Sequence, residues 1–350
     1  MTMLHVGMDL SRDRLDVHVL DDRGGTVAVE TAGPDRSGLA VLAARYRRPP
    51  VRAAIESMNG ARFVHDRLEE AGWDVEIADA QKVKGLAPLA CKTDRIDAWV
   101  LAELSRRDLV PAIWLPTPGV RAERELARYR LHLGRHRTMF KNRVHATLVA
   151  FGEPCPLSDL FGRAGRELLD TLQLPDPWAD HVRSAIGQVD QLNKEIAALA
   201  GQLTAAGADH PSVPLLMTAP GIGPILGYTI AAEIGDIARF ASAKKLCGYT
   251  GLCPRVYQSG GVDRRGRLTG NGPRYLRWAL IEAAVHARRH PAYAAHYQHT
   301  KARLGRQRGA KVARVELARK LAEAIWHMLT KGEPFNPAGP TDGLAALTAH

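Results

Sequence analysis

The stretch LHVGMDLSRDRLDVHVLDDRGGTVAVE, residues 4–30, decides the fold class of the N-terminal part of the chain. Its apolar residues gather in three short runs, at 4–9, 15–19 and 26–29, and the middle run alternates apolar and polar positions as a half-buried β-strand does. The turn sequence DRGG at 22–25 separates the second run from the third. Three consecutive strands are therefore predicted to open the domain as a meander.

The residues that follow continue with alternating helices and strands. Their periodicity predicts a helix at 39–46, a strand at 51–56, a helix at 61–71, a strand at 75–79 and a helix at 93–106. The resulting order, βββαβαβα, is the one expected of an α/β domain with an RNase H-like fold. We assign residues 1–110 to this domain.

The middle of the chain, residues 111–210, is predicted to be helical. Two long segments with helical periodicity, 119–151 and 178–206, are separated by a proline-rich break. The second segment has a heptad pattern with Asn193 at a core position, formed by Val182, Ile186, Val189, Asn193, Ile196, Ala200 and Leu203. The pattern fits an antiparallel helical hairpin within one chain or a coiled-coil seam between two copies, and both remain open.

The C-terminal part is predicted to be rich in helices and punctuated by glycine. We assign residues 211–335 to this domain and expect a flexible tail over 336–350. A glycine-rich stretch at 248–272 precedes helices near 273–289 and 310–330. No internal repeat and no second βββαβα order follows the first domain.

Positive charge is concentrated in the C-terminal part. The chain has a formal net charge of +11 at pH 7. Residues 211–340 contain 20 Lys or Arg against 7 Asp or Glu, a net charge of +13, so the other 220 residues sum to −2. Such a surface favours an acidic partner, and nucleic acid is the best candidate, although a basic surface without a partner is the alternative.

The cysteines and the N-terminus indicate a compartment. The four cysteines, at 91, 155, 247 and 253, show neither zinc-ligand spacing nor a disulfide framework, so we expect reduced thiols. The first residues lack a signal-peptide pattern, and no apolar run approaches the roughly 18 residues of a membrane span. We expect a cytoplasmic protein.

Four carboxylates are candidates for a metal site. Asp9 ends the first predicted strand, Glu56 ends the fourth, and Asp94 and Asp97 share one face of a helix. Four converging acids repel one another unless a divalent cation balances them, and hard oxygen ligands suit Mg²⁺. Two Mg²⁺ ions about 4 Å apart, or Mn²⁺ in their place, would support phosphoryl transfer. For each acid alone, a helix cap or a surface charge is the simpler interpretation.

Five motifs occur in order along the chain: GMDLS around Asp9, AAIESMNG around Glu56, KTDRIDA around Asp94 and Asp97, then PGIGP at 220–224, and finally GYTGLCPRVYQSGG. The sequence resembles the RuvC-like DEDD transposases of insertion sequences, from about residue 4 to about residue 330. Recombination in that family is guided by a bridge RNA, and the family includes site-specific DNA invertases.

The resemblance implies a role for Ser259 and a set of partners. From the residues alone, Ser259-Gly260-Gly261 is a turn. The family's nucleophilic serine matches Ser259, which implies a covalent phosphoserine intermediate assisted by the metal-bound carboxylates. Tyr257 is a competing nucleophile. The resemblance also implies donor and target DNA, a guide RNA bound by both domains, and a homodimer or homotetramer with shared active sites.

Basic residues of the C-terminal part are candidate nucleic-acid contacts. Arginines at this density can neutralise phosphates. The candidates are Lys244, Lys245, Arg255, Arg264, Arg265, Arg267, Arg274 and Arg277. The PGIGP motif is either a helix-hairpin-helix turn that approaches a phosphate or a plain helix start.

Three other functions are weighed against the serine-dependent transposase. A RuvC-like junction endonuclease would use water as the nucleophile and leave no protein–DNA bond. An actin-like ATPase or sugar kinase also begins with G-x-D-x-S, but it needs a second RNase H-like half with a glycine-rich phosphate loop. A purely structural DNA-binding protein would not depend on Mg²⁺.

Overall fold

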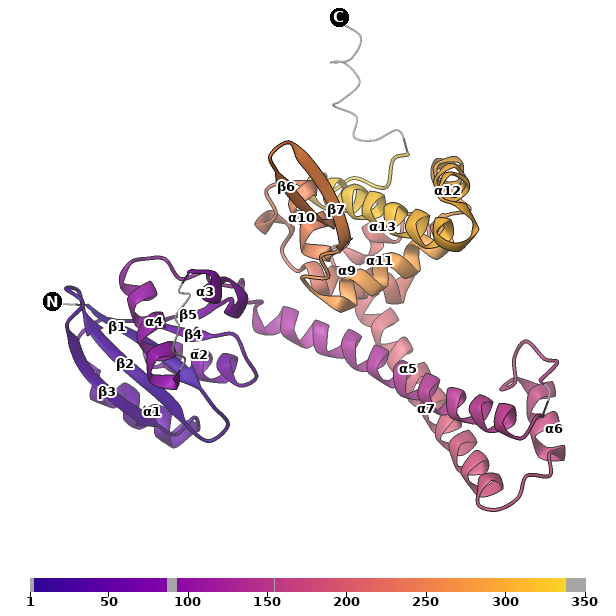
Figure 1. Ribbon diagram of the computed structural model, residues 1–350, viewed down its shortest axis with the longest axis horizontal. Coiled ribbons are helices and arrows are strands. Elements are labelled where there is room, and N and C mark those ends of the chain that lie inside the picture. Colours follow the sequence, from indigo (N-terminus) through magenta and orange to yellow (C-terminus); the bar gives the residue numbers. More distant parts are fainter. Residues whose placement is uncertain (1–2, 87–92, 154, 338–350) are drawn as a thin grey trace, which may run out of the picture. The chain divides into compact units, whose positions relative to one another are not determined.

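The computed structural model describes residues 3–86, 93–153 and 155–337. The chain divides into an N-terminal unit that ends at Leu115 and a C-terminal unit that begins at Pro116 (Figure 1). The predicted tail, residues 336–350, lies outside the described residues from 338 onward.

The N-terminal unit is a mixed α/β domain built on one five-stranded sheet. Its elements are β1 (Leu4–Leu10), β2 (Leu15–Asp21), β3 (Thr26–Ala32), α1 (Arg36–Arg45), β4 (Val51–Glu56), α2 (Ala61–Glu70), β5 (Asp74–Ala78), α3 (Ala80–Leu86) and α4 (Asp94–Arg106). The strand order is β3-β2-β1-β4-β5. The first three strands pair antiparallel, and β4 and β5 continue the sheet parallel to β1. The predicted order of elements is confirmed, with α3 as the one addition.

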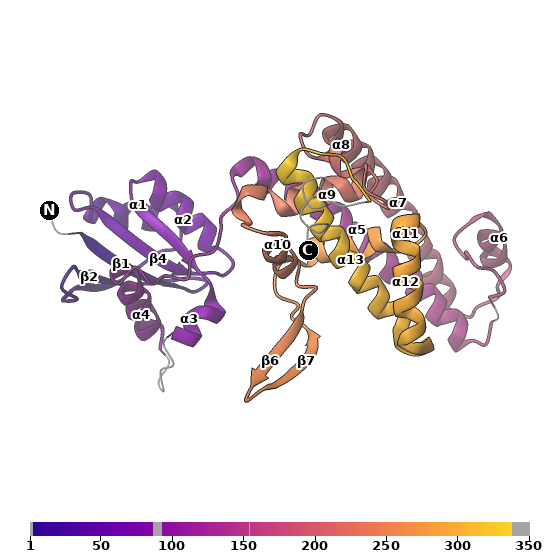
Figure 2. The same ribbon diagram turned by 90° about the horizontal axis from the view of Figure 1, so that it is seen from above.

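Alternation along the strands assigns side chains to two faces of the sheet. In β1, Leu4, Val6 and Met8 are buried in a core with residues of α1 and α2, so His5, Gly7 and Asp9 belong to the other face. The helix α4 covers that other face and packs on β1, β2 and β4. Figure 2 shows α1 and α2 on one side of the strands and α4 on the other.

Gly7 lets the backbone of α4 lie directly on β1. A Cβ atom at residue 7 would lie 1.9 Å from the carbonyl oxygen of Ala98 and 2.3 Å from the amide nitrogen of Ala102. Real Cβ atoms do not approach backbone atoms this closely, so any side chain at this position would push the helix away. The small residues Ala98 and Ala102 complete this close contact.

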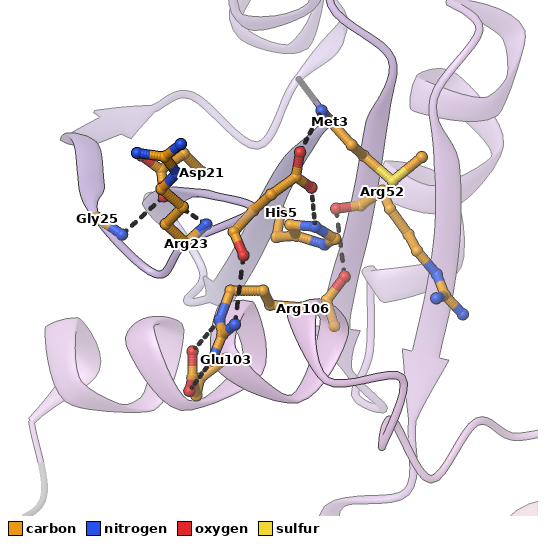
Figure 3. A network of polar contacts seen from close by, with 10 residues as sticks. Met3, His5, Asp21, Arg23, Gly25, Arg52, Glu103 and Arg106 are labelled. Carbon is orange, nitrogen blue, oxygen red and sulfur yellow. Dashed lines mark hydrogen bonds and ion pairs between the residues drawn. The ribbon is translucent and has the colours of Figure 1, made fainter. Parts of the chain in front are cut away.

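Polar contacts anchor the C-terminal end of α4 (Figure 3). Arg106 donates two hydrogen bonds to Glu103, of 2.8 and 2.7 Å, and its Nη1 lies 3.4 Å from the carbonyl oxygen of Asp22 in the β2–β3 turn. The Ser105 hydroxyl donates to the carbonyl oxygen of Arg52 in β4 at 3.3 Å. Hydrogen bonds from Arg106 and then from Arg107 hold the pKa of Glu103 at about 2. The helix is therefore tied to the sheet at the end opposite Asp94.

The C-terminal unit begins with a helical hairpin. The helices α5 (Pro118–Ala150) and α7 (Trp178–Ala208) lie side by side, with the short α6 (Arg163–Thr171) in the connection between them (Figure 1). The start of α5 packs with the end of α7 and vice versa, so the two helices are antiparallel. Of the two predicted packings for the heptad pattern, the hairpin within one chain is the one observed.

The predicted core position of Asn193 is wrong. The buried positions of α7 that follow heptad spacing are Val182, Ala185, Val189, Leu192, Ile196 and Leu203. The predicted register shares every second position with this seam and is one residue off at the others. Asn193 is exposed, and its Oδ1 accepts a hydrogen bond of 3.0 Å from Nη1 of Arg137 in α5. Both registers fit heptad spacing, and the choice depends on the surface that α5 presents.

The rest of the C-terminal unit is mostly helical around a large apolar core. The elements are α8 (Val213–Leu216), α9 (Pro224–Ile234), the short 3₁₀ helix η1 (Ile237–Arg239), α10 (Ala243–Thr250), β6 (Pro254–Ser259), β7 (Val262–Leu268), α11 (Arg274–Ala287), α12 (Pro291–Arg303) and α13 (Gly305–Lys331). The predicted helices near 273–289 and 310–330 are confirmed. The strands β6 and β7 were not predicted. Within the described ranges, no helix has the length and apolar character needed to cross a membrane.

A buried ion pair fastens α5 to α9. The carboxylate of Glu233 is fully buried and accepts two hydrogen bonds from Arg128, of 2.6 and 2.8 Å. The neighbouring Arg124 donates at 2.7 Å to the carbonyl oxygens of Ala232 and Glu233 near the end of α9. A buried charge of this kind is tolerated only when it is paired and hydrogen-bonded. The arginines on this part of α5 are thus held at a defined place beside the C-terminal core.

We expect the substitution Gly7→Ala to lower the free energy of unfolding by roughly 1–3 kcal/mol or more, because the new methyl group overlaps the backbone of α4. Chemical denaturation followed by circular dichroism measures the change. The matched control is Gly85→Ala in α3, where a Cβ atom meets nothing within 4 Å and alanine favours the helix. Equal midpoints for the Gly7 variant and the wild type would show that α4 does not rest on β1.

Candidate active site

Two of the four predicted carboxylates lie at one edge of the sheet. Asp9 lies near the end of β1 and Glu56 is the last residue of β4. These strands are parallel neighbours in which Met8 pairs with Ile55, so Asp9 and Glu56 occupy equivalent positions on the face that α4 covers.

The other two carboxylates come from the first turn of α4. Thr93 caps this helix through a hydrogen bond of 3.4 Å from the amide of Ile96 to its hydroxyl. Asp94 and Asp97 follow in the first turn, where the free amide groups of the helix favour negative charge. Because α4 runs back along β1 from this end, its first turn lies at the edge that carries Asp9.

The other three carboxylates act electrostatically on Asp9. Burial, and then the charges of Asp97, Asp94 and Glu56, raise the pKa of Asp9 from 3.8 to about 6. A fifth carboxylate, Asp16, adds to this effect from β2, where it pairs directly with Asp9. Sequence reasoning missed Asp16, although a strand register for residues 4–21 would have placed it opposite Asp9.

Arg14 is a second residue that sequence reasoning missed. From the β1–β2 connection, its Nε donates to Asp16 at 2.8 Å and its Nη2 donates to Asp94 at 2.9 Å. The side chain therefore balances part of the negative charge and joins the β1–β2 hairpin to the first turn of α4.

The carboxylate cluster fits a divalent cation by chemistry and charge. It offers hard oxygen donors, and burial, followed by the charges of the neighbouring carboxylates, raises the pKa of Asp9, so a bound cation would favour its ionised form. Over the described ranges, no three acid, histidine or cysteine side chains lie close enough together to form a finished ligand set. Asp94 instead directs one oxygen at Arg14.

Ser259 lies in the C-terminal unit, at the tip of the two-stranded ribbon formed by β6 and β7. It is the last residue of β6 and pairs with Val262, the first of β7. Gly260 and Gly261 between them have φ angles of +56° and +81°, which only glycine adopts readily in a two-residue hairpin turn. The prediction of a turn at this position is confirmed.

After Pro254, the side chains of the ribbon that the structure describes are solvent-exposed. Tyr257 is 60% exposed, and it pairs across the ribbon with Arg264. Every residue of β6 from Arg255 to Ser259 is exposed, so neither face of this strand packs on the core.

The predicted nucleic-acid contacts fall into three places. Lys244 and Lys245 are exposed in the first turn of α10, and Arg274 is exposed at the start of α11. The ribbon carries the exposed side chains of Arg255, Arg264 and Arg267; it also contains Arg265, whose side chain lies outside the described part of the structure.

Arg277 has a structural contact that sequence reasoning did not foresee. It is partly buried, and its Nη1 donates to the carbonyl oxygens of Thr250 and Gly270, at 3.3 and 3.2 Å. The side chain therefore holds the two ends of the segment that carries the ribbon.

The glycines of PGIGP have different surroundings. Gly221 has a φ of +80°, and a Cβ atom there would lie 2.3 Å from the carbonyl oxygen of Ala283 in α11. This glycine therefore serves close packing of the loop against α11. Gly223 is the N-cap of α9, and a Cβ atom there would meet nothing within 4 Å.

Comparison with known proteins agrees with this architecture. A family profile for DEDD transposases of the IS110 type matches residues 6–152. A second profile, described as "Transposase IS116/IS110/IS902 family", matches residues 213–299. The first match contains all four carboxylates and the second contains the ribbon with Ser259.

Relatives of similar length match along nearly the whole chain. A "Probable family 20 transposase" of Pseudomonas aeruginosa is 29% identical over 96% of this chain and 100% of its own length. The transposase for insertion sequence element IS1328 of Yersinia enterocolitica is 26% identical, over 95% of this chain and 98% of its own. The transposase for insertion sequence element IS1111A of Coxiella burnetii is 24% identical, with coverages of 94% and 90%. The chain belongs to the IS116/IS110/IS902 family of transposases.

Proposed function

We propose that this transposase cuts and rejoins DNA with Ser259 as the nucleophile and with Asp9, Glu56, Asp94 and Asp97 as ligands of Mg²⁺. The observation that carries the proposal is the electrostatic coupling of Asp97, Asp94 and Glu56 to Asp9, in residues far apart along the chain. The transposase profiles that match both units support it.

We assign an RNase H-like, RuvC-like fold to the N-terminal unit. The support is its sheet, in which three antiparallel strands are continued by two parallel ones with helices on both faces. The finer division into a RuvC-like domain at 1–110, a helical region at 111–210 and a transposase domain at 211–335 belongs to the same proposal.

The four carboxylates would hold the metal, and their capacity to do so would depend on the ionisation of Asp9 and on the contact between Asp94 and Arg14. Bound Mg²⁺, in one or two ions, would polarise the phosphodiester and help to deprotonate the attacking hydroxyl. With a pKa of about 6, Asp9 is ionised at neutral pH and can serve as a ligand. Asp94 accepts from Arg14 through one oxygen, and its other oxygen can turn to a cation.

The ribbon would present Ser259 to DNA. A two-stranded β-ribbon fits the major groove, and its arginines can contact phosphates on either side. In the chemical step the Ser259 hydroxyl oxygen forms a bond to phosphorus, the serine proton passes to a base, and the bond from phosphorus to the leaving sugar oxygen breaks. In the second step the hydroxyl of a new DNA end forms a bond to the same phosphorus and gives up its proton, the bond from phosphorus to the serine oxygen breaks, and the serine oxygen is protonated again.

The guide RNA and the oligomer are also parts of the proposal. Both come from the family resemblance: a bridge RNA bound by the two domains, and a dimer or tetramer in which protomers share active sites. The basic surface of the C-terminal unit supports binding of nucleic acid in general.

We expect Mg²⁺ to stabilise the protein above pH 7 and to have little effect near pH 5. The pKa of Asp9 is raised in the folded protein, so without metal its contribution to stability is present at low pH and is lost as the pH rises through about 6. Above that pH the ionised carboxylate binds Mg²⁺, which restores stability. Thermal unfolding at both pH values, with Mg²⁺ or with a chelator, measures the effect.

The control for this experiment is a pair of variants. Asp9→Asn should lose the stabilisation by Mg²⁺ above pH 7, whereas Asp13→Asn, in the exposed β1–β2 connection, should keep it. A response to Mg²⁺ in the Asp9→Asn protein equal to that of the wild type would place the metal elsewhere.

We expect Ser259→Ala to abolish the covalent protein–DNA adduct and to slow strand exchange by roughly a thousandfold or more, as loss of a nucleophile does in other enzymes. The assay combines the protein with Mg²⁺ and with labelled DNA and RNA from the flanks of its own gene. A denaturing gel then separates protein-linked DNA from free DNA. Tyr257→Phe tests the competing nucleophile, and Ser158→Ala, at an exposed site, is the control.

The same gel decides between the serine mechanism and the water-dependent endonuclease. If the wild-type protein cleaves the DNA but every product is free of protein, water is the nucleophile. If the adduct persists in Ser259→Ala and disappears in Tyr257→Phe, the tyrosine carries the reaction.

A further inference from the structure

A groove of about 740 Å³ in the C-terminal unit is lined by residues of α5, α7 and α11, and none of its lining residues belongs to the ribbon. Three arginines of α5 line it: Arg130, Arg135 and Arg137. Trp278 and Glu282 of α11 line the opposite side. We call this the α5–α11 groove. Glu282 is the one carboxylate among the lining residues that the structure describes, so the lining carries a net positive charge.

One hydrogen-bond donor of Arg130 has no acceptor among the described residues. Its Nε is buried, and no hydrogen-bond partner for it occurs in the described parts of the chain. Burial and the nearby charge of Arg137 both lower the pKa of Arg130. A half-buried guanidinium group beside a second one, with a donor unused, is costly unless an anion approaches it.

One lining residue, Arg135, also belongs to a cluster of arginines around Tyr275, at the start of α11. The guanidinium groups of Arg274, Arg128 and Arg135 lie 4.9, 5.0 and 5.6 Å from the centre of the Tyr275 ring. Arg128 is neutralised by Glu233. For Arg135 and Arg274, no carboxylate partner occurs within the described ranges. Arg274 and Arg135 therefore add positive charge beside the groove that no carboxylate of the described residues balances.

The helix α5 also carries a net positive charge, which the near-neutral total of residues outside 211–340 does not reveal. Residues 118–150 contain eight Lys or Arg and two Asp or Glu, whereas the rest of the middle region is acidic. The helix is therefore a second basic surface, separate from the basic C-terminal stretch that the sequence emphasised.

We propose that the α5–α11 groove binds single-stranded nucleic acid, with its arginines on the phosphates and an unpaired base against the partly buried side chain of Trp278. Guanidinium groups beside an aromatic ring form the usual platform for single strands. The volume of about 740 Å³ is within the range of small-molecule sites and is enough for one unpaired nucleotide. The proposal deepens the proposed function, but it does not depend on cleavage by Ser259.

The test measures binding without cleavage. The protein carries Ser259→Ala and is kept in a chelator, so failure of the cleavage chemistry cannot affect the result. The probes are a fluorescent single-stranded RNA of mixed sequence, the same sequence as single-stranded DNA, and its duplex. Fluorescence anisotropy gives affinity at several salt concentrations.

The main variant is Arg130→Gln/Arg135→Gln/Arg137→Gln. We expect it to bind the single strands about tenfold or more weakly and to lower the slope of log affinity against log salt by about 2, since each lost phosphate contact contributes about 0.7. The control Arg143→Gln/Arg163→Gln/Arg183→Gln removes the same charge at exposed sites outside the groove and should change the slope much less.

A second variant guards against simple misfolding. Glu282→Gln removes the carboxylate from the groove and should tighten binding of single strands, a gain that an unfolded protein cannot imitate. A loss confined to the RNA probe or to the DNA probe identifies the natural strand, and equal losses show that the shared backbone is recognised. Unchanged binding of both single strands by the groove variant, or a loss confined to the duplex, would overturn the proposal.

Discussion

The contact between Gly7 and α4 is the constraint on which the candidate active site depends. The helix can lie on β1 only because residue 7 has no side chain. Its C-terminal end is tied to the sheet by Arg106 and Ser105, and this sets its direction. The first turn of α4 therefore reaches the strand ends, where its two acids join the field around Asp9. A helix held farther from the sheet would leave these acids as isolated surface charges.

The four candidate metal ligands lie in the N-terminal unit, and the candidate nucleic-acid contacts lie in the C-terminal unit. A cluster of uncompensated acids repels a DNA phosphate, whereas exposed arginines attract one. Under the proposed function, the N-terminal unit would therefore accept DNA only after it has bound a cation, whereas the C-terminal unit would bind nucleic acid without one. The ion pair between Arg128 and Glu233 matters to the second property, because it fastens α5 to α9 and holds the Arg128 guanidinium over the Tyr275 ring of α11.

Much of the N-terminal unit could be predicted because its signals are local. Alternation over 4–30 and 51–79 is enough to define the strands, and their order brings Asp9 and Glu56 to one edge. The ion pairs of Arg14 depend on the conformation of the β1–β2 connection, and the position of Asp16 opposite Asp9 depends on the pairing register of β1 and β2. Neither can be predicted from the strand assignments alone. In α7 the misplacement of Asn193 has a similar cause, since two registers fit the same spacing. The ribbon was missed because both faces of β6 are exposed, so no apolar alternation marks the strand.

The ribbon also has a consequence for how copies of the protein behave together. Among the residues that the structure describes, its two strands pair only with each other, so each presents an open edge to which another extended chain could add. Arginines occur on both strands, and like charges brought side by side oppose such an addition. The side chains suited to meeting phosphates therefore also protect the free protein against edge-to-edge aggregation.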